Sequence, residues 1–293
     1  MTNHAALRKS RIMMIVSMTI FGTIALFVRN IAVSSAEVAL YRAVLAAVLL
    51  GSYFLVTGQK IDFSAIRKEL PLLLLSGIAM GINWIFLFEA YRYTTVSVAT
   101  LSYYFAPVIV TVACPILFKE KMGARQWLCF LMSTLGIVLI TGIGDVSGSN
   151  THIIGILFGF GAAVLYASVI LLNKFIKGVA GVQRTFLQFV AAVVILLPYV
   201  LLTSGINLNA LSASGWVNLL IVGIIHTGIT YCLYFSALKD IPGQEAAILS
   251  YIDPLVAVAV SVFVLGERLT AMQLIGGMLI LGFTLYNEIK TEN

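Results

Sequence analysis

Two charged side chains stand inside stretches of this sequence that are otherwise apolar. Asp253 lies near the centre of an apolar run at about 244–265, and Arg42 lies about five residues into another run at about 37–56. A charge at the centre of a bilayer costs about 2.5–3.5 kcal/mol, so each group is expected to face a partner or a water-filled cavity. Together they offer a cation and an anion that could hold the opposite charges of one small molecule.

Proline makes two of the apolar runs unsuitable for contact with lipid. Pro254 follows Asp253 directly and has no amide hydrogen, which leaves the carbonyl of Ser250 without its helical partner. Pro107 does the same for the carbonyl of Tyr103. Bare polar backbone within a membrane must face protein or water. We therefore predict helix kinks at Pro107 and Pro254, with both prolines lining one central cavity.

The two prolines belong to a duplicated sequence. An offset of 147 residues pairs Pro107 with Pro254 without a gap, and it pairs Asp253 with Ala106, so the halves differ where the charge lies. Further matches at this offset are Phe88 with Phe235, Ala90 with Ala237, Ala99 with Ala246, Tyr104 with Tyr251, Glu120 with Glu267 and Gln126 with Gln273. We predict two repeats, one over residues 1–146 and the other over 147–293.

Composition identifies an integral membrane protein. The 293 residues are 60% apolar and 10% charged, with a mean hydropathy of +1.03, whereas soluble domains are about 25% charged. The formal net charge of +6 needs no nucleic-acid partner, because basic residues of membrane proteins gather in cytoplasmic loops. Spanning runs lie near 12–30, 37–56, 70–90, 95–118, 125–143, 153–173, 185–203, 215–236, 244–265 and 271–289. An all-α protein with ten transmembrane helices is predicted.

The distribution of Lys and Arg sets the expected orientation. With the N-terminus inside, fourteen of these residues lie in inside segments and three in outside segments. Both termini are therefore expected in the cytoplasm, in a multi-pass protein of the cytoplasmic membrane. Because each repeat has five helices, the second repeat must enter the membrane with the opposite orientation. Such inverted repeats place a substrate site near the midplane and permit alternating access.

Two long runs carry a resemblance to a known family. They are AYRYTTVSVATLSYYFAPVIV and SALKDIPGQEAAILSYIDPLVAV, each followed by a glutamate, Glu120 or Glu267, and a fresh helix. They resemble the EamA type of the drug/metabolite transporter superfamily over nearly the whole chain. The resemblance is specific for the fold, two tandem EamA-like repeats, and weak for the substrate. Members move amino acids, nucleosides, quaternary amines and other metabolites.

The resemblance also extends to single residues. Arg42 matches an arginine common in the second helix of the family, and Asp253-Pro254 matches its acidic residue before proline. Members often have Trp-Gly in helix one and Trp-Ala in helix six. This chain has Phe21-Gly22 and Tyr166-Ala167 instead, which keeps an aromatic surface and changes its hydrogen-bond donors.

Other polar and small residues have structural explanations that compete with functional ones. Gln126, Gln273, Glu120 and Glu267 lie at predicted helix starts, where capping boxes and the helix dipole favour them. The motifs Gly77-x-x-x-Gly81 and Gly155-x-x-x-Gly159 are expected to pack helices of the same chain. His226 lies mid-span; it could accept a proton, because the pKa of an unperturbed histidine lies near neutrality, or simply bond across helices.

These features predict a secondary transporter for a small polar or amphipathic metabolite. An amino acid or related zwitterion is the best match, moved by alternating access and in the direction of export. The expected substrate-binding residues are Arg42, Trp84, Tyr103, Tyr166, Tyr251 and Asp253. Asp253 and His226 are the candidates to carry a coupling proton, since burial favours the protonated form of a carboxyl group.

Three alternatives stay open. For a quaternary amine or another organic cation, Asp253 and the aromatic faces would suffice and Arg42 would be structural. A membrane-embedded enzyme would need paired carboxylates, HExxH or several histidines, which the spans lack. A receptor or scaffold would leave the inverted repeat without a purpose. No metal, cofactor or nucleic acid is expected, only a small-molecule substrate and the lipid bilayer around a monomer.

Overall fold

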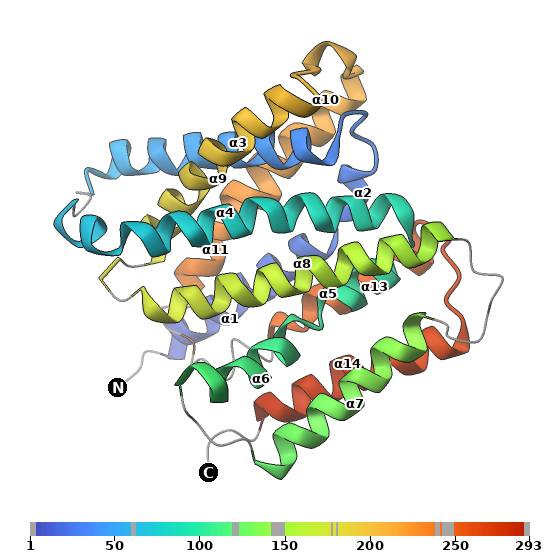
Figure 1. Ribbon diagram of the computed structural model, residues 1–293. Helices are drawn as coiled ribbons and strands as arrows, with labels where there is room; N and C mark the ends of the chain where they lie inside the picture. The colour runs from blue at the N-terminus through green and yellow to red at the C-terminus, as the bar shows by residue number, and fades with distance from the viewer. Residues whose placement is uncertain are drawn as a thin grey trace.

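A bundle of helices accounts for nearly all of the chain that can be described (Figure 1). The computed structural model describes residues 4–59, 63–118, 123–141, 150–176, 178–179, 181–237, 241 and 249–289, and these contain helices and no strands. Six stretches are long and apolar enough to cross a membrane, and four shorter apolar helices accompany them. In the described ranges these ten segments follow the order of the ten predicted spans. The protein is an all-α integral membrane protein of two inverted five-helix repeats.

The first repeat contains the helices α1 to α7. Their bounds are α1 (His4–Gly22), α2 (Ile24–Val28), α3 (Ser35–Thr57), α4 (Phe63–Tyr93), α5 (Val96–Tyr103), α6 (Ala106–Phe118) and α7 (Ala124–Thr141). The first span consists of α1 and α2, and the fourth consists of α5 and α6. Ser34 begins α3 with a capping box, in which its side chain accepts from the amide of Glu37 and the Glu37 carboxylate accepts from the amide of Ser34.

The second repeat contains α8 to α14. Their bounds are α8 (Asn150–Phe175), α9 (Gly181–Thr203), the 3₁₀ turn η1 (Leu208–Ala210), α10 (Ala213–Leu220), the π-helical segment η2 (Ile221–Ile229), α11 (Thr230–Ala237), α13 (Ile252–Phe263) and α14 (Ala271–Ile289). The eighth span runs from α10 through η2 to α11. Side chains stabilise η2, because His226, Thr227 and Thr230 each reach the carbonyl five residues earlier. π-helical insertions often accompany functional sites.

The two repeats pack as a symmetric pair. Equivalent spans meet each other: the second packs on the seventh through α3 and α9, the fourth on the ninth through α5 and α13, and the fifth on the tenth through α7 and α14. The third span packs on the sixth through α4 and α8. Its counterpart, the eighth span, packs in the same way on the first through α11 and α1. The start of α1 and the end of α14 lie at the same end of the bundle (Figure 1). An even total of ten spans brings both termini to one end, and the odd number of five per repeat gives the two repeats opposite orientations.

Both prolines mark helix breaks at equivalent positions. The fourth span is interrupted at Tyr104 and Phe105, and α6 begins just before Pro107. In the second repeat Tyr251 precedes α13, whose third residue is Pro254. Proline fits the first turn of a helix, where its missing amide hydrogen has no intrahelical acceptor. The predicted kinks are therefore breaks, at Tyr104 and at Tyr251, which the offset of 147 pairs. Residues 244–248, within the predicted ninth span, lie outside the described residues.

Glycines allow the closest helix crossings. Gly77 and Gly81 lie against α9, and Gly155 and Gly159 lie against Thr94 and the α5 helix. The GxxxG motifs thus pack helices of the same chain, as expected from the sequence. In the pair α7 and α14, a Cβ atom added at Gly136 would lie 2.6 Å from the carbonyl oxygen of Gly276. The two backbones can approach this closely only because Gly136 has no side chain.

Gly136→Ala is expected to lower the free energy of unfolding by about 1–3 kcal/mol, since the new methyl group forces α7 away from α14. Gly282→Ala on α14 is the matched control, because a Cβ atom there has no neighbour within 4 Å. This control should be neutral or stabilising, since alanine is the better helix former. The melting temperatures of the two purified variants in detergent test the prediction. Equal melting temperatures would contradict the close crossing.

Candidate functional site

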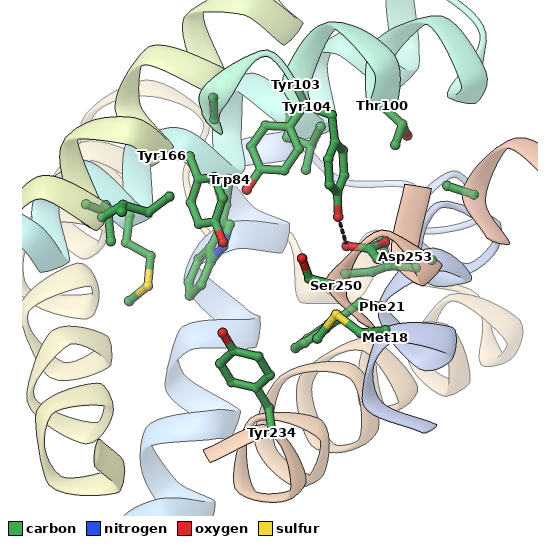
Figure 2. A pocket seen from close by; sticks show the side chains of 18 of the residues that line it. Met18, Phe21, Trp84, Thr100, Tyr103, Tyr104, Tyr166, Tyr234, Ser250 and Asp253 are labelled. Atoms are coloured by element: carbon green, nitrogen blue, oxygen red, sulfur yellow. Dashed lines mark hydrogen bonds between the residues drawn. The ribbon is translucent and has the colours of Figure 1, made fainter. Parts of the chain in front are cut away.

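A cavity of about 510 Å³ lies between the repeats, and the two helix breaks border it. Its walls come from both halves of the chain, including α1, α3, α4, α5, α8, α9, α11 and α13. All six residues that the sequence assigns to substrate binding line it, namely Arg42, Trp84, Tyr103, Tyr166, Tyr251 and Asp253. Of the two prolines expected to line the cavity, Pro107 does, whereas Pro254 is buried in the first turn of α13 outside the lining. Figure 2 shows the aromatic rings and Asp253 turned toward a common space.

Asp253 connects the break points of the two repeats. It is the second residue of α13, where the helix dipole favours a negative charge. Its Oδ2 accepts a hydrogen bond of 2.6 Å from the hydroxyl of Tyr104 (Figure 2). Tyr104 follows α5 directly at the break in the fourth span. The hydrogen bond therefore joins the fourth span to the ninth, at the point where both helices are interrupted.

Arg42 on α3 of the first repeat is held in place by a residue of the second repeat. Its Nε donates a hydrogen bond of 3.0 Å to Thr227 Oγ1 in η2. The guanidinium carbon lies 4.3 Å from the ring centre of Trp84 and 5.4 Å from that of Phe88. A planar guanidinium stacks well on aromatic faces. The bond to Thr227 uses one of the five N–H donors of the side chain. Arg42 also lines the cavity.

The two charges do not neutralise each other. In the part of the chain that the structure describes, the ion pairs join Arg29 to Glu267 and Arg92 to Glu89. Among the described residues that line the cavity, Asp253 is the one acid and Arg42 the one base. The cavity therefore keeps a separate anionic group and cationic group, each fixed by its own partner.

Aromatic side chains form much of the remaining wall. The rings of Tyr103 and Tyr166 have their centres 5.2 Å apart, and Tyr103 also meets Tyr104 edge to face at 5.8 Å. Tyr231 packs between Phe21 and Phe189, at 5.1 and 5.3 Å. Such rings present apolar faces to a ligand, while the tyrosine hydroxyls provide polar edges.

His226 lies behind the wall of the cavity and is fully buried. Its Nε2 is 3.0 Å from Thr23 Oγ1, and its Nδ1 is 3.2 Å from the carbonyl oxygen of Ile221. Since a carbonyl only accepts, Nδ1 carries the proton in that bond. Both ring nitrogens are thus engaged: Nδ1 bonds within η2, and Nε2 ties η2 to Thr23 at the break between α1 and α2. This geometry favours the hydrogen-bonding explanation of His226.

Sequence reasoning did not single out Tyr104 or the paired amides of Asn173 and Gln188. Gln188 Nε2 donates to Ser76 Oγ at 2.6 Å and to Asn173 Oδ1 at 2.8 Å, and both amides line the cavity. The match of Tyr104 with Tyr251 at the offset of 147 could have indicated that Tyr104 lies at the site. For the two amides the sequence held only a weaker indication, namely that Gln188 is a polar residue within an apolar span.

Thr227→Val should destabilise the protein by about 1–3 kcal/mol, because it leaves the buried Nε of Arg42 without its acceptor. Thr203→Val is a suitable control, since Thr203 is exposed and donates only to the carbonyl of Tyr199 in its own helix. The readout is the melting temperature of each purified variant. A Thr227 variant as stable as the Thr203 variant would show that Arg42 does not depend on this bond.

Comparisons with known proteins agree with the repeats and the fold. The profile of the EamA-like transporter family matches the chain twice, over residues 8–142 and 153–287. An uncharacterized transporter of Bacillus subtilis (strain 168), YxxF, is 32% identical over 270 residues, which cover 92% of this chain and 86% of that protein. An uncharacterized transporter of Archaeoglobus fulgidus is 28% identical over 269 residues, covering 91% and 92%.

Among solved structures that share the fold, a crystal structure has a TM-score of 0.65 at 18% identity over 94% of this chain and 95% of that one. The family profile covers both halves of the chain, and the two related proteins carry the name of transporters rather than of enzymes. The chain therefore belongs to the EamA-like transporter family.

Proposed function

We propose that this transporter moves a small zwitterionic metabolite, an amino acid or a close relative, out of the cell by alternating access. One observation carries the proposal. A buried guanidinium from the first repeat and a carboxylate from the second line the same cavity, and no ion pair joins them among the described residues. A molecule with a carboxylate and an ammonium group has the matching charges.

The chemistry of each group supports its assigned partner. Arg42 is rigidly stacked on Trp84 and bound through Nε, so its remaining donors can bind a carboxylate without losing further side-chain entropy. Asp253 accepts one hydrogen bond from Tyr104 and can accept more, since a carboxylate has about four lone-pair sites. It can therefore accept from the ammonium group of the ligand.

The remaining wall suits the apolar part of an amino acid. Tyr103, Tyr166 and Tyr251 line the same space. A volume of about 510 Å³ lies within the range of roughly 300–1,000 Å³ found for small-molecule pockets. The amides of Asn173 and Gln188 add one donor and one acceptor for a polar side chain of the substrate.

Proton exchange would give the direction of transport. A single carboxylate can hold either a proton or an ammonium group, so the two compete for Asp253. A carrier that releases the substrate on one side of the membrane binds a proton there and returns with that proton on Asp253. Each proton that enters the cell is therefore exchanged for one substrate molecule that leaves it. Asp253 is the leading candidate for the coupling proton, and His226 is the second, since it bonds to the break in the first span.

A quaternary amine or another organic cation is the second candidate substrate. The observation that favours it is the environment of Arg42, whose guanidinium already covers Trp84 and reaches Thr227. In that case Arg42 stabilises the fold, while Asp253 and the tyrosine faces bind the cation.

We further propose that the protein works as a monomer in the cytoplasmic membrane, with both termini in the cytoplasm. Support comes from the excess of Lys and Arg in the segments assigned to the inside and from the common end at which α1 begins and α14 ends (Figure 1). A cysteine at residue 293 that a membrane-impermeant thiol reagent labels in intact cells would contradict this orientation.

Flux into proteoliposomes separates the two substrate classes, once a thermal-shift screen of amino acids, amines and nucleosides has found a ligand. Asp253→Asn should reduce transport of either class by tenfold or more, which is about the effect of losing one charge-assisted hydrogen bond. Arg42→Gln should reduce only the transport of a carboxylate-bearing substrate.

Glu89→Gln provides the control, because it also changes a carboxylate to an amide, on an exposed ion pair away from the cavity. It should transport at the wild-type rate. Wild-type rates for Asp253→Asn at every pH would remove Asp253 from both binding and coupling.

A further inference from the structure

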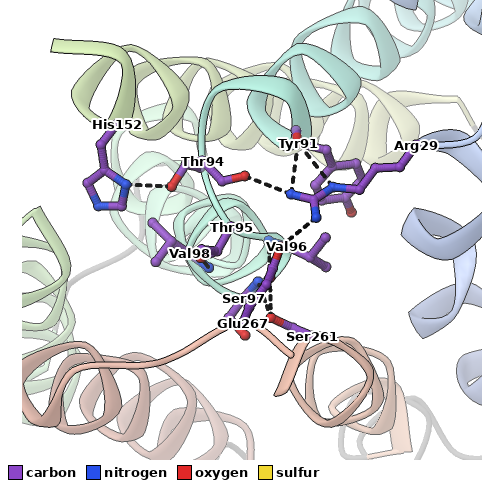
Figure 3. A network of polar contacts seen from close by, with 10 residues as sticks. All are labelled: Arg29, Tyr91, Thr94, Thr95, Val96, Ser97, Val98, His152, Ser261 and Glu267. Atoms are coloured by element: carbon purple, nitrogen blue, oxygen red, sulfur yellow. Dashed lines mark hydrogen bonds and ion pairs between the residues drawn. The ribbon is translucent and has the colours of Figure 1, made fainter. Parts of the chain in front are cut away.

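A network of charged and polar groups joins the two repeats at one end of the bundle (Figure 3). Arg29 follows α2 and donates to main-chain carbonyls at the end of α4. Its Nε and Nη2 reach the oxygen of Tyr91 at 3.2 and 3.0 Å, and Nη2 also reaches the oxygen of Thr94 at 3.0 Å. Its Nη1 pairs with Glu267 Oε1 at 2.5 Å. Arg29 thus bridges the first span, the third span and the second repeat.

Glu267 completes the network on the other side. Its Oε2 accepts a hydrogen bond of 2.8 Å from the amide of Val96, the first residue of α5, and another from the hydroxyl of Ser261. Ser261 Oγ in turn accepts from the amide of Ser97 at 3.3 Å. A carboxylate at a helix N-terminus is favoured by the helix dipole. Glu267 is therefore a cap for α5, a helix of the other repeat.

This role differs from the sequence expectation, in which Glu267 served the helix that follows it. That helix, α14, has its own capping box: the amide of Gln273 donates to Thr270 Oγ1 at 3.2 Å, and the amide of Thr270 donates to Gln273 Oε1 at 3.0 Å. The sequence could not show that Glu267 reaches α5, because Val96 lies 171 residues earlier.

The network lies one helical turn beyond the cavity. Thr100 and Ala257 line the cavity. Val96 lies four residues before Thr100 on α5, and Ser261 lies four residues after Ala257 on α13, in each case about 6 Å away at 1.5 Å per residue. Tyr91, whose carbonyl binds Arg29, lines the cavity as well. The side chains of Arg29 and Glu267 are only 30% and 11% exposed. The cavity cannot open at this end while α2, α5 and α13 stay joined in this way.

We propose that Arg29 and Glu267 form a latch that holds this end of the cavity closed and separates when the cavity opens there. The inference rests on the alternating-access transport proposed above. The contacts of the latch cross between the repeats, so any motion that parts α13 from α5 must break them. Thr94 extends the connection to α8, since its Oγ1 lies 2.8 Å from His152 Nδ1 (Figure 3).

The charges of the latch also recur in the sequence. The offset of 147 pairs Glu267 with Glu120, and the alignment of Phe21-Gly22 with Tyr166-Ala167 pairs Arg29 with Lys174. Glu120 and the side chain of Lys174 lie outside the described residues, so the proposal concerns the described pair alone.

Thiol labelling tests the latch without a substrate. Ala257→Cys places a reporter in the cavity wall, in a chain whose Cys114, Cys129 and Cys232 are changed to alanine. A membrane-impermeant maleimide is applied to sealed vesicles of each orientation. Glu267→Gln should raise the labelling rate from the latch side about tenfold, as expected for the loss of a charge-assisted hydrogen bond. Labelling from the opposite side should fall, because the two openings exclude each other.

Glu89→Gln is the matched control. It removes a carboxylate at the same end of the bundle, from an ion pair of 3.3 Å with Arg92 that stays within α4, and should leave both labelling rates unchanged. Ser261→Ala is the second variant if Glu267→Gln fails to fold, and should raise the rate from the latch side by a smaller factor.

Two results would overturn the latch: labelling rates equal to those of the parent protein in both variants, or a rise from both sides together, which indicates a loosened fold. Absence of flux for every substrate in proteoliposomes would instead refute the transport function. The two failures are distinguishable, since labelling is measured without substrate.

Discussion

Polar backbone and charge cannot face lipid, and this constraint shapes the bundle. The fourth span breaks at Tyr104 and the ninth at Tyr251, each just before a helix that begins with a proline in its first turn. Exposed to hydrocarbon, such breaks would leave polar groups without partners. The other spans therefore enclose them, and α5 packs directly on α13. The cavity, the site of Asp253 and the hydrogen bond from Tyr104 all follow from this enclosure.

The scaffold is symmetric, while the chemistry is not. Equivalent spans of the two repeats pack on each other, and the helix breaks fall at paired positions. Neither charge of the cavity has a charged counterpart: the offset of 147 pairs Asp253 with Ala106, and α3 and α9, whose bounds differ by 146 residues, pair Arg42 with Gln188. A symmetric scaffold can exchange the conformations of its halves, and an asymmetric lining can still bind one ligand in one orientation. The duplicated chain thus combines both properties.

Much of this architecture was readable from the sequence, because it follows from local rules. Spanning length, the offset of 147 and proline chemistry predicted ten helices, two repeats and kinks at Pro107 and Pro254, which the structure shows as helix breaks. The cost of buried charge pointed to Arg42 and Asp253. The partners were not readable: Thr227 is 185 residues from Arg42, Tyr104 is 149 from Asp253, and Val96 is 171 from Glu267. Only tertiary packing brings residues so far apart in the chain together, and a single sequence does not show which helices pack on each other.

The central claim is that the transported molecule occupies the cavity between Arg42 and Asp253, and the fluorescence of Trp84 tests it most directly. The chain has three tryptophans, of which Trp127 and Trp216 are exposed and Trp84 is buried in the cavity wall. In the variant W127F/W216F, Trp84 is the sole tryptophan, and it lies under the guanidinium of Arg42. We expect its emission to change saturably with ligand, with a midpoint that equals the half-saturation of transport. Transport that saturates while the emission stays constant would contradict the account.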